Sequence, residues 1–142
     1  MADISIVVAS VIRGANSSVE VGRVAGETIT AGMAVYLSAA NTWLKAVATS
    51  GGTALQSGYG TILGVALHAA LASQPLAVQT GGQLPLGAPL LVGVFYYVSQ
   101  TAAGGISLVA DLGTADYSSI IGYGATVAIM QIQPMATGLI IA

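Results

Sequence analysis

The sequence reads GETITAGMAVYLS at Gly26–Ser38 and GAPLLVGVFYYVS at Gly87–Ser99. The two segments align without gaps at a constant offset of 61 residues, and both glycines, one tyrosine and the final serine coincide. Each segment begins with turn-forming glycine and ends in a short β-branched and aromatic run, which favours a turn followed by a β-strand. We interpret the pair as the start of an internal repeat of strands.

The similarity continues beyond these segments. ILGVA at Ile62–Ala66 matches IIGYG at Ile120–Gly124, and each is followed by a strand-like run that contains a glutamine, Gln79 or Gln131. The predicted order in each copy is strand, turn, strand, glycine-centred strand and closing strand. Because two copies are too few for a solenoid, we expect them to fold on each other as a single domain. That domain spans about 19–142, with repeats at about 26–80 and 87–133.

The spacing of glycine and proline along the rest of the chain is typical of an all-β protein. Its 142 residues include 19 glycines and four prolines, which separate short runs rich in Val, Ile, Leu and Tyr. Runs of this kind at intervals of about 8–12 residues are typical of a β-sandwich or barrel. We predict a compact β-barrel or sandwich built from the two pseudo-repeats. Only Val65–Ala72 admits a helix, of one or two turns at most, because Leu67 and Leu71 are spaced four residues apart. The expected strands are Ile4–Ile12, Val19–Val24, Ala34–Leu37, Trp43–Ala48, Thr61–Leu67, Leu76–Thr80, Val94–Ser99, Ile106–Val109, Ser119–Tyr123, Thr126–Gln133 and Gly138–Ile141.

Charged residues are scarce. They make up 6% of the chain, against about 25% in an ordinary soluble protein, while hydrophobic residues make up 55%. This composition excludes intrinsic disorder, which requires low hydrophobicity and high charge. With three basic residues and a net charge of -2, the chain lacks the Lys and Arg clusters that neutralise phosphates, so we expect no nucleic-acid partner. The absence of cysteine excludes disulfides and thiolate metal sites.

The mean hydropathy of +0.85 raises the question of a membrane. The most apolar window, Leu84–Val98, is interrupted by two prolines and two glycines, so it does not predict a spanning helix. Ile4–Ile12 is long enough for the core of a signal peptide, but Asp3 precedes it and Arg13 follows it, which is the wrong charge pattern. We expect no membrane partner.

No charged residue lies between Lys45 and Asp111. A monomer with such a stretch leaves large apolar or weakly polar areas in contact with water, which free monomers usually avoid. One interpretation is a neutral surface of Ser, Thr, Gln and Gly. The interpretation that we favour is a surface covered by other subunits.

Four stretches carry a resemblance to a known family. They are AGETITAGMAVYL (Ala25–Leu37), ILGVALHAALASQPLAVQTGG (Ile62–Gly82), GVFYYVSQTAAGGISLVADL (Gly93–Leu112) and YSSIIGYGAT (Tyr117–Thr126). In these stretches, and over about Val19 to Gln133, the chain resembles the small capsid cement, or head decoration, proteins of tailed bacteriophages. The resemblance implies an all-β structural protein of the virion, made in the host cytoplasm. Such a protein binds the outer surface of the capsid and stabilises it by clamping neighbouring capsid subunits.

The resemblance also implies the partners. These are the major capsid protein and further copies of the chain itself, as a homo-oligomer that is most often a homotrimer. Related modules occur in phage head and tail fibres, so a fibre module that binds a host receptor or glycan is the alternative. Tyr36, Trp43, Tyr96 and Tyr97 are candidates for stacking on sugars, but they lie inside apolar strands, so we expect them to pack in the core.

We divide the chain into an N-terminal β arm and linker at 1–18 and the domain at 19–142. The arm, Ala2–Ile12, has a strong β-propensity and precedes a linker of small residues, Gly14–Ser18, which we expect to be flexible. It is either the first strand of its own domain or a strand that adds to the sheet edge of a neighbour, and the sequence leaves both open. The residues that we expect at the interface with the capsid or neighbouring subunits are Ile4, Ile6, Val8, Ser10, Ile12, Arg13 and Arg23.

The sequence predicts no enzyme. A catalytic triad or metal site would have to combine His68, the only histidine, with one of five scattered acids, and no spacing suggests it. We therefore expect no catalytic residue, no metal and no cofactor, and we expect His68 to cap a turn or line an interface.

Overall fold

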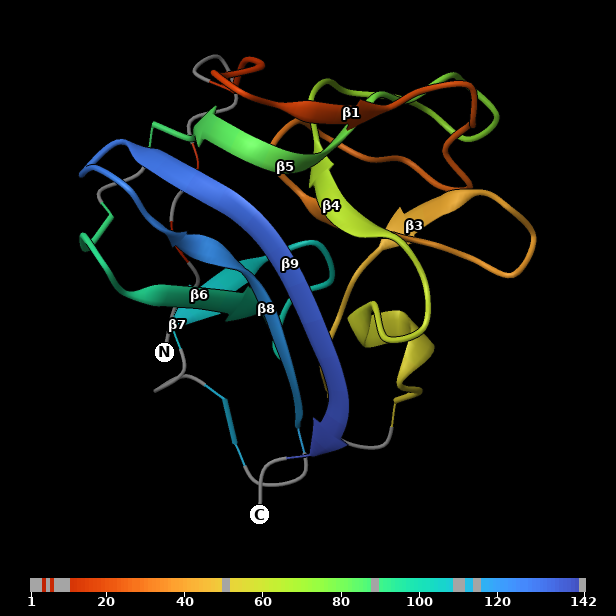
Figure 1. Cartoon of the computed structure of the whole chain (residues 1–142). Helices are drawn as coiled ribbons and strands as arrows, with labels where there is room; N and C mark the ends of the chain where they lie inside the picture. The colour runs from red at the N-terminus through yellow and green to blue at the C-terminus, as the bar shows by residue number, and fades with distance from the viewer. Residues whose placement is uncertain are drawn as a thin grey trace.

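The computed structural model describes residues 4, 6, 11–49, 52–87, 90–108, 112–113 and 116–140. Within these residues the chain forms β-strands and a single 3-10 helix, η2 (Leu55–Ser57), and no α-helix (Figure 1). The all-β class predicted from the sequence is confirmed. The strands are β1 (Ser18–Glu20), β2 (Ala34–Leu37), β3 (Trp43–Lys45), β4 (Leu63–Ala66), β5 (Val78–Pro85), β6 (Phe95–Val98), β7 (Ile106–Leu108), β8 (Tyr117–Gly124) and β9 (Ile129–Ile140).

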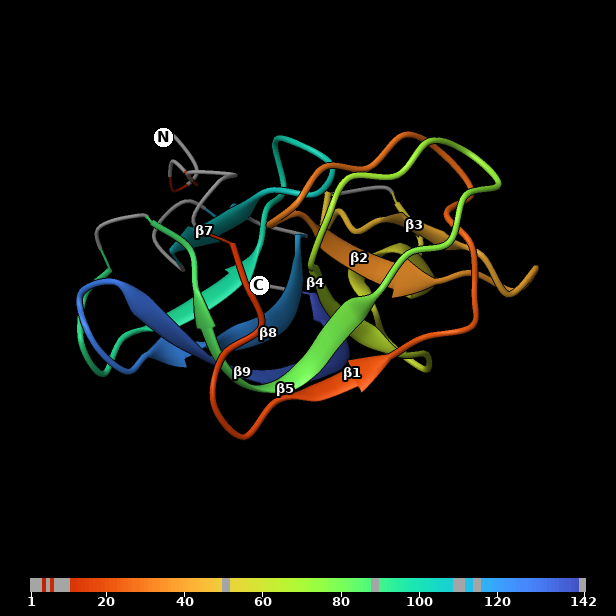
Figure 2. The same cartoon turned by 90° about the horizontal axis from the view of Figure 1, so that it is seen from above.

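The strands form one curled antiparallel sheet, shaped like a half-barrel (Figure 2). Hydrogen-bonded neighbours follow the order β3-β2-β4-β5-β9-β8-β6-β7, and β1 pairs with β5 beside this path. The first half of the sheet, β2 to β5, therefore has the same connectivity as the second half, β6 to β9. The two halves meet where β5 pairs with β9, as a pseudo-twofold rotation at that point requires.

Aligned residues of the two halves serve the same local purpose. Gly32 and Gly93, which precede β2 and β6, have φ angles of 86° and 77°, a left-handed conformation that glycine adopts without strain. The aligned serines at the ends of the same strands hold the turns that follow. Ser38 Oγ and Ser99 Oγ each accept a hydrogen bond from the backbone N–H of a nearby threonine, at 3.3 and 3.1 Å.

The glycine-centred strands are β4 and β8. A Cβ added at Gly64 would lie 2.6 Å from the backbone oxygen of Gln79, and a Cβ at Gly122 would lie 2.1 Å from that of Gln131. Both distances are too short for any side chain. Glycine is therefore needed at both positions, because the next strand passes directly against its Cα.

Aligned residues nevertheless face opposite sides of the sheet. Ala34 and Tyr36 point into the main core, whereas Phe95 and Tyr97, which align with them, lie on the outer face. In the second half it is Tyr96 that enters the core. Side chains alternate along a strand, so a slip of one residue moves the whole set to the other face.

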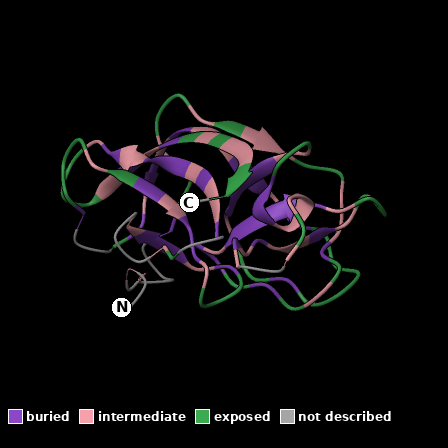
Figure 3. Cartoon of the chain, turned by 90° about the horizontal axis from the view of Figure 1, so that it is seen from below, coloured by how far each residue is buried: buried purple, intermediate pink, exposed green. Residues whose placement is uncertain are grey.

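Two hydrophobic cores result. The main core lies inside the curled sheet. A second core lies on the outer face of the first half, beneath two covering segments, one between β1 and β2 and the other between β4 and β5. The two segments pair where Ile29 N donates to Ala70 O and Ala70 N donates to Ile29 O, both at 2.9 Å. Exposed residues lie mainly on the connecting loops (Figure 3). The second core comprises Ala25, Ile29, Val35, Leu37, Trp43, Ala66, Ala70, Leu76 and Val78.

The one segment thought able to form a helix forms none. Val65 and Ala66 complete β4, and the rest of Val65–Ala72 continues as a covering segment of the second core. The helix propensity of Ala and Leu is a weak preference that tertiary contacts override. Here the overriding contact is the pairing of Ala70 with Ile29.

Three described residues of the N-terminal arm, Ile4, Ile6 and Val11, contact the core of their own domain. Val11 is buried in the main core, and Ile4 and Ile6 pack against it. Ile4 N donates a hydrogen bond to the backbone oxygen of Ile106 in β7, at 3.0 Å. Of the predicted strand Ile4–Ile12, only Ile4, Ile6, Val11 and Ile12 are described, and these four lie outside the strands.

The close approach at Gly122 predicts a large effect of a small substitution. We expect Gly122→Ala to lower the free energy of unfolding by about 3 kcal/mol or more, because its Cβ would overlap the backbone of β9. Gly81→Ala is the matched control, because a Cβ there would make an ordinary contact at 3.5 Å with Ser18. Urea denaturation measures both variants. Equal stabilities of the two variants would contradict the close approach.

The raised pKa of Tyr36 predicts that the free energy of unfolding falls at alkaline pH. Burial, reinforced by the negative charge of Glu27, raises the pKa of its hydroxyl above the ordinary value of 10.0. Above about pH 10 the unfolded chain therefore releases a proton that the folded chain retains, and the free energy of unfolding falls as pH rises. Tyr36→Phe removes this contribution. Denaturation curves between about pH 9 and 11 should show a shallower decline in the variant, and parallel declines would contradict the assignment.

Candidate functional site

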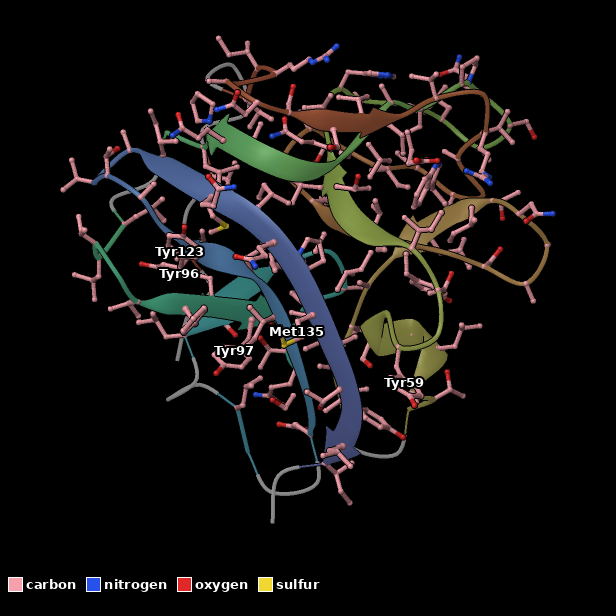
Figure 4. The ribbon with its side chains drawn as sticks, viewed as in Figure 1. Tyr59, Tyr96, Tyr97, Tyr123 and Met135 are labelled. Carbon is pink, nitrogen blue, oxygen red and sulfur yellow. The ribbon has the colours of Figure 1, made fainter. Side chains whose placement is uncertain are left out.

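The outer face of the second half carries large apolar side chains from three strands. Phe95 on β6 lies opposite Tyr123 on β8, with ring centroids 6.0 Å apart in an edge-to-face arrangement. Ile120 on β8 lies opposite both Tyr97 on β6 and Met135 on β9. Residues directly opposite each other share a face of the sheet. We call these five residues the aromatic face, of which Figure 4 labels Tyr97, Tyr123 and Met135.

A β-bulge aims two of these side chains outward. The pairing of β6 with β8 passes from Tyr96–Gly122 to Tyr97–Ile120, which leaves Ile121 as an extra residue. The side chain of Ile121 is fully buried in the main core. As a result Ile120 and Tyr123 lie on the same outer face although they are three residues apart.

The aromatic face is accessible and uncharged. Phe95 is 51% exposed and Met135 is 56% exposed, while the other three side chains are half-buried. Gln131, opposite Tyr123, and Gln83, opposite Gln131, continue the row with neutral side chains. Among the described residues, the charged side chains are Arg13, Glu20, Arg23, Glu27 and Lys45, which precede β4, and Asp116, which is buried.

The aromatic face is accessible because the described connection from β8 to β9 does not cover it. In the first half, the connection from β4 to β5 runs over 67–77 and contributes Ala70 and Leu76 to the second core. The corresponding connection from β8 to β9 is a tight turn, in which Ala125 N and Thr126 N both donate to Ile129 O, at 2.9 and 3.1 Å. A turn of this length cannot reach across the sheet.

A groove of about 520 Å³ lies between the C-terminal part of β9 and the segment 58–63. Tyr59 forms one wall, and its ring lies against Gly138, where an added Cβ would be 2.7 Å from the ring (Figure 4). Beyond Ile132, β9 pairs only with β8 among the described strands, so the groove follows an unpaired strand edge. Its lining comprises Gly58, Tyr59, Gly60, Thr61, Ile62, Leu63, Thr80, Pro134 and Ala136.

The apolar residues predicted at the interface have different surroundings. Ile4 and Ile6 pack against the main core, and Ile12 is exposed. Val8 and Ser10 lie outside the described residues. Among the described apolar residues predicted at the interface, Ile12 is therefore the accessible one.

The two predicted interface arginines have local partners. Arg13 Nε donates to Ser17 Oγ at 2.5 Å. Arg23 Nη1 lies 3.0 Å from Glu20 Oε1 in a partly exposed ion pair. Pairs of this kind contribute little to stability, about 0–1 kcal/mol, so both arginines remain available to other partners.

His68 connects the two ends of the segment between β4 and β5. Its Nε2 accepts a hydrogen bond from Ala77 N at 3.0 Å, which assigns the proton to Nδ1, and Nδ1 donates to Ala69 O at 2.9 Å. Glu20 pairs with Arg23 and Glu27 with Lys45. In the described part of the chain, no group of three or more His, Asp or Glu side chains is placed to hold a metal ion.

The aromatic residues considered for sugar stacking divide into two groups. Trp43, Tyr96 and Tyr36 are buried, which confirms core packing for these three. Tyr97 instead belongs to the aromatic face, so the prediction of core packing was wrong for it. The one-residue slip between the halves explains the difference, because it turns Tyr97 outward where its aligned partner Tyr36 points inward.

Comparisons with known proteins identify no relative: no family model, no curated protein and no solved structure matches the chain. Among the described residues, no helix is long and apolar enough to cross a membrane.

Sequence analysis missed Phe95, Ile120, Tyr123 and Met135 as site residues. The signal that identifies them is the unequal length of the aligned connections, 67–77 in the first repeat against 125–128 in the second. The shorter connection shows which outer face the loop between β8 and β9 cannot cover.

The exposure of the aromatic face predicts that its residues add little to stability. We expect Phe95→Ser and Met135→Ser each to change the free energy of unfolding by less than about 1 kcal/mol and to lower the binding of a hydrophobic dye. Ile121→Ala is the buried control and should cost about 2–5 kcal/mol. A loss in Phe95→Ser as large as that in Ile121→Ala would show that Phe95 is a core residue.

Proposed function

We propose that this protein is a capsid decoration, or cement, protein of a tailed bacteriophage. It binds the outer surface of the capsid and stabilises the shell by clamping neighbouring capsid subunits. The observation that carries the proposal is the accessible, uncharged aromatic face on the second half, whereas the outer face of the first half is covered by the chain's own segments.

The composition of the aromatic face suits a protein partner. Interface cores are enriched in Tyr, Phe and Met and depleted in charged residues. The five side chains occupy one continuous sheet surface, with neutral glutamines beside them. A specific interface buries about 800 Å² per partner, and this face with its glutamine border is a suitable centre for such an area.

The mechanical task requires no titrating or catalytic group. A filled phage head is under internal pressure, and a clamp across subunit junctions resists it through contact area, shape fit and hydrogen bonds. Repetition over the shell multiplies a modest single-site affinity when neighbouring copies also touch. The rigid sheet supports this role, since strands β6, β8 and β9 hold the aromatic face in one geometry.

Capsid binding by matched variants tests the proposal. We expect Phe95→Asp and Met135→Asp to weaken co-sedimentation with capsids that lack this protein at least about tenfold, because each places a charge in an apolar contact. Val21→Asp is the control, since Val21 is an exposed apolar residue of the segment after β1. Unchanged binding of both aromatic-face variants would exclude this face as the capsid contact.

The groove beside Tyr59 favours a second candidate, a fibre module that binds a host glycan. An exposed tyrosine beside threonine hydroxyls is a surface on which a sugar ring can stack. This candidate predicts that Tyr59→Ala abolishes binding to immobilised bacterial glycans while Phe95→Asp does not. If the wild-type protein binds none of the glycans tested, the glycan-binding function is excluded.

A further inference from the structure

The sheet divides along one edge of β5. β1 and the linker before it occupy the first edge, where Val19 pairs with Gln79 and Gln83 N donates to Ala15 O at 2.9 Å. β4 and β9 therefore both lie along the second edge (Figure 1). The pairing with β4 ends at Gln79, and the pairing with β9 begins at Gly82. Beyond this point the two strands separate, and the groove beside Tyr59 lies between them. We call this groove the fork.

The β4 side of the fork is a strand edge that leaves its partner. Residues of an antiparallel strand direct their backbone N–H and C=O groups alternately to one edge and to the other. Ile62 O accepts from Leu37 N in β2, at 2.9 Å, so the backbone groups of Leu63 are directed away from β2 and toward the fork. Among the described residues, the backbone N–H groups of Gly60 and Thr61 have no hydrogen-bond partner. This side therefore offers backbone groups to a further strand.

The β9 side of the fork is a second strand edge. Up to Ile132, β9 lies between β5 and β8, and from there to Ile140 it pairs with β8 alone among the described strands. Alternate residues of this part direct backbone groups toward the fork. Pro134 has no N–H, so it removes one donor and makes the edge a poor template for indiscriminate pairing. The carbonyl acceptors of the edge remain.

The walls of the fork leave room for a chain of modest side chains. Gly58 and Gly60 have no side chain, and Tyr59 between them is 49% exposed, so its ring is open to contact. The volume of about 520 Å³ lies within the range of about 300–1,000 Å³ that is common for binding pockets. No charged residue lines the fork. A charged side chain placed in it would lose water without gaining an ionic partner.

We propose that the fork binds an extended, uncharged peptide segment of another protein as an added β-strand. An extended polypeptide presents N–H and C=O groups alternately on both of its edges, which complements the two strand edges that face the fork. Sugar hydroxyls have no such alternation, so the backbone of the fork favours a peptide over the glycan considered above. Pro134 and Ala136 line the fork, whereas Met135 between them belongs to the aromatic face. Peptide binding is therefore independent of capsid binding through that face.

Backbone-methylated peptides test the proposal. The probes are fluorescein-labelled peptides of about seven residues in which threonine alternates with alanine, valine or leucine, with a lysine at each end for solubility. Fluorescence anisotropy with protein at up to about 100 µM should detect binding of at least one of them. N-methylation of alternate residues removes the N–H donors of one peptide edge and keeps every side chain. We expect it to weaken binding at least about tenfold, because the strand edges of the fork then lack their donors. Binding of none of the peptides, or equal binding of the methylated form, would overturn the proposal.

Neighbouring residues of β9 supply matched protein variants. Ala136→Asp places a charge in the fork, and we expect it to weaken peptide binding at least about tenfold. Met135→Asp places the same charge on the opposite face and should bind the peptide like the wild type. Tyr59→Ala removes one wall of the fork without adding a charge and should also weaken binding. Melting temperatures confirm that each variant folds.

The variants also separate the two binding functions. Equal losses of peptide binding in Ala136→Asp and Met135→Asp, or binding like the wild type in both Ala136→Asp and Tyr59→Ala, would overturn the proposal. Loss of capsid binding in Met135→Asp with peptide binding retained supports two separate sites. Failure of the fork to bind peptides is therefore distinguishable from failure of the aromatic face to bind capsids.

Discussion

The pairing of β5 with β9 is the constraint on which the rest of the structure depends. It joins two four-stranded halves of the same connectivity into one curled sheet, with Leu84 opposite Met130 and Gly82 opposite Ile132. Leu84 and Met130 are fully buried, so this junction is also the centre of the main core. Without it each half would expose its inner face, and a two-copy repeat has no further copy to cover that face.

The sequence predicts the strands well and their faces poorly. Glycine punctuation and the repeat place β2 at Ala34–Leu37 as observed, and the glycine-centred strands appear as β4 and β8. Parts of the predicted runs Thr126–Gln133 and Gly138–Ile141 join into the single strand β9 (Ile129–Ile140), because Pro134 is tolerated at the bulge between the pairs Gly122–Ile132 and Ile120–Met135. The alignment could not show which face each residue takes, since bulges and a one-residue slip reverse it.

The candidate binding surface follows from the unequal loops of the two halves. Both halves present an outer sheet face, but only the first has a connection long enough to cover it. The stretch without charges from Ala46 to Ala110, which suggested a covered surface, supplies β6 and its exposed Phe95. Composition thus predicted a covered surface, while the position of the candidate contact depended on loop lengths and register, which only the fold reveals.

We propose that this chain forms part of a phage shell and contacts it through the aromatic face. The most direct test is the number of copies per major capsid protein in purified virions of the phage that encodes it, by quantitative mass spectrometry. The account predicts a ratio of about one, because a cement contact is repeated at every equivalent site of the shell. Absence from the virion, or only a few copies per particle, would contradict it.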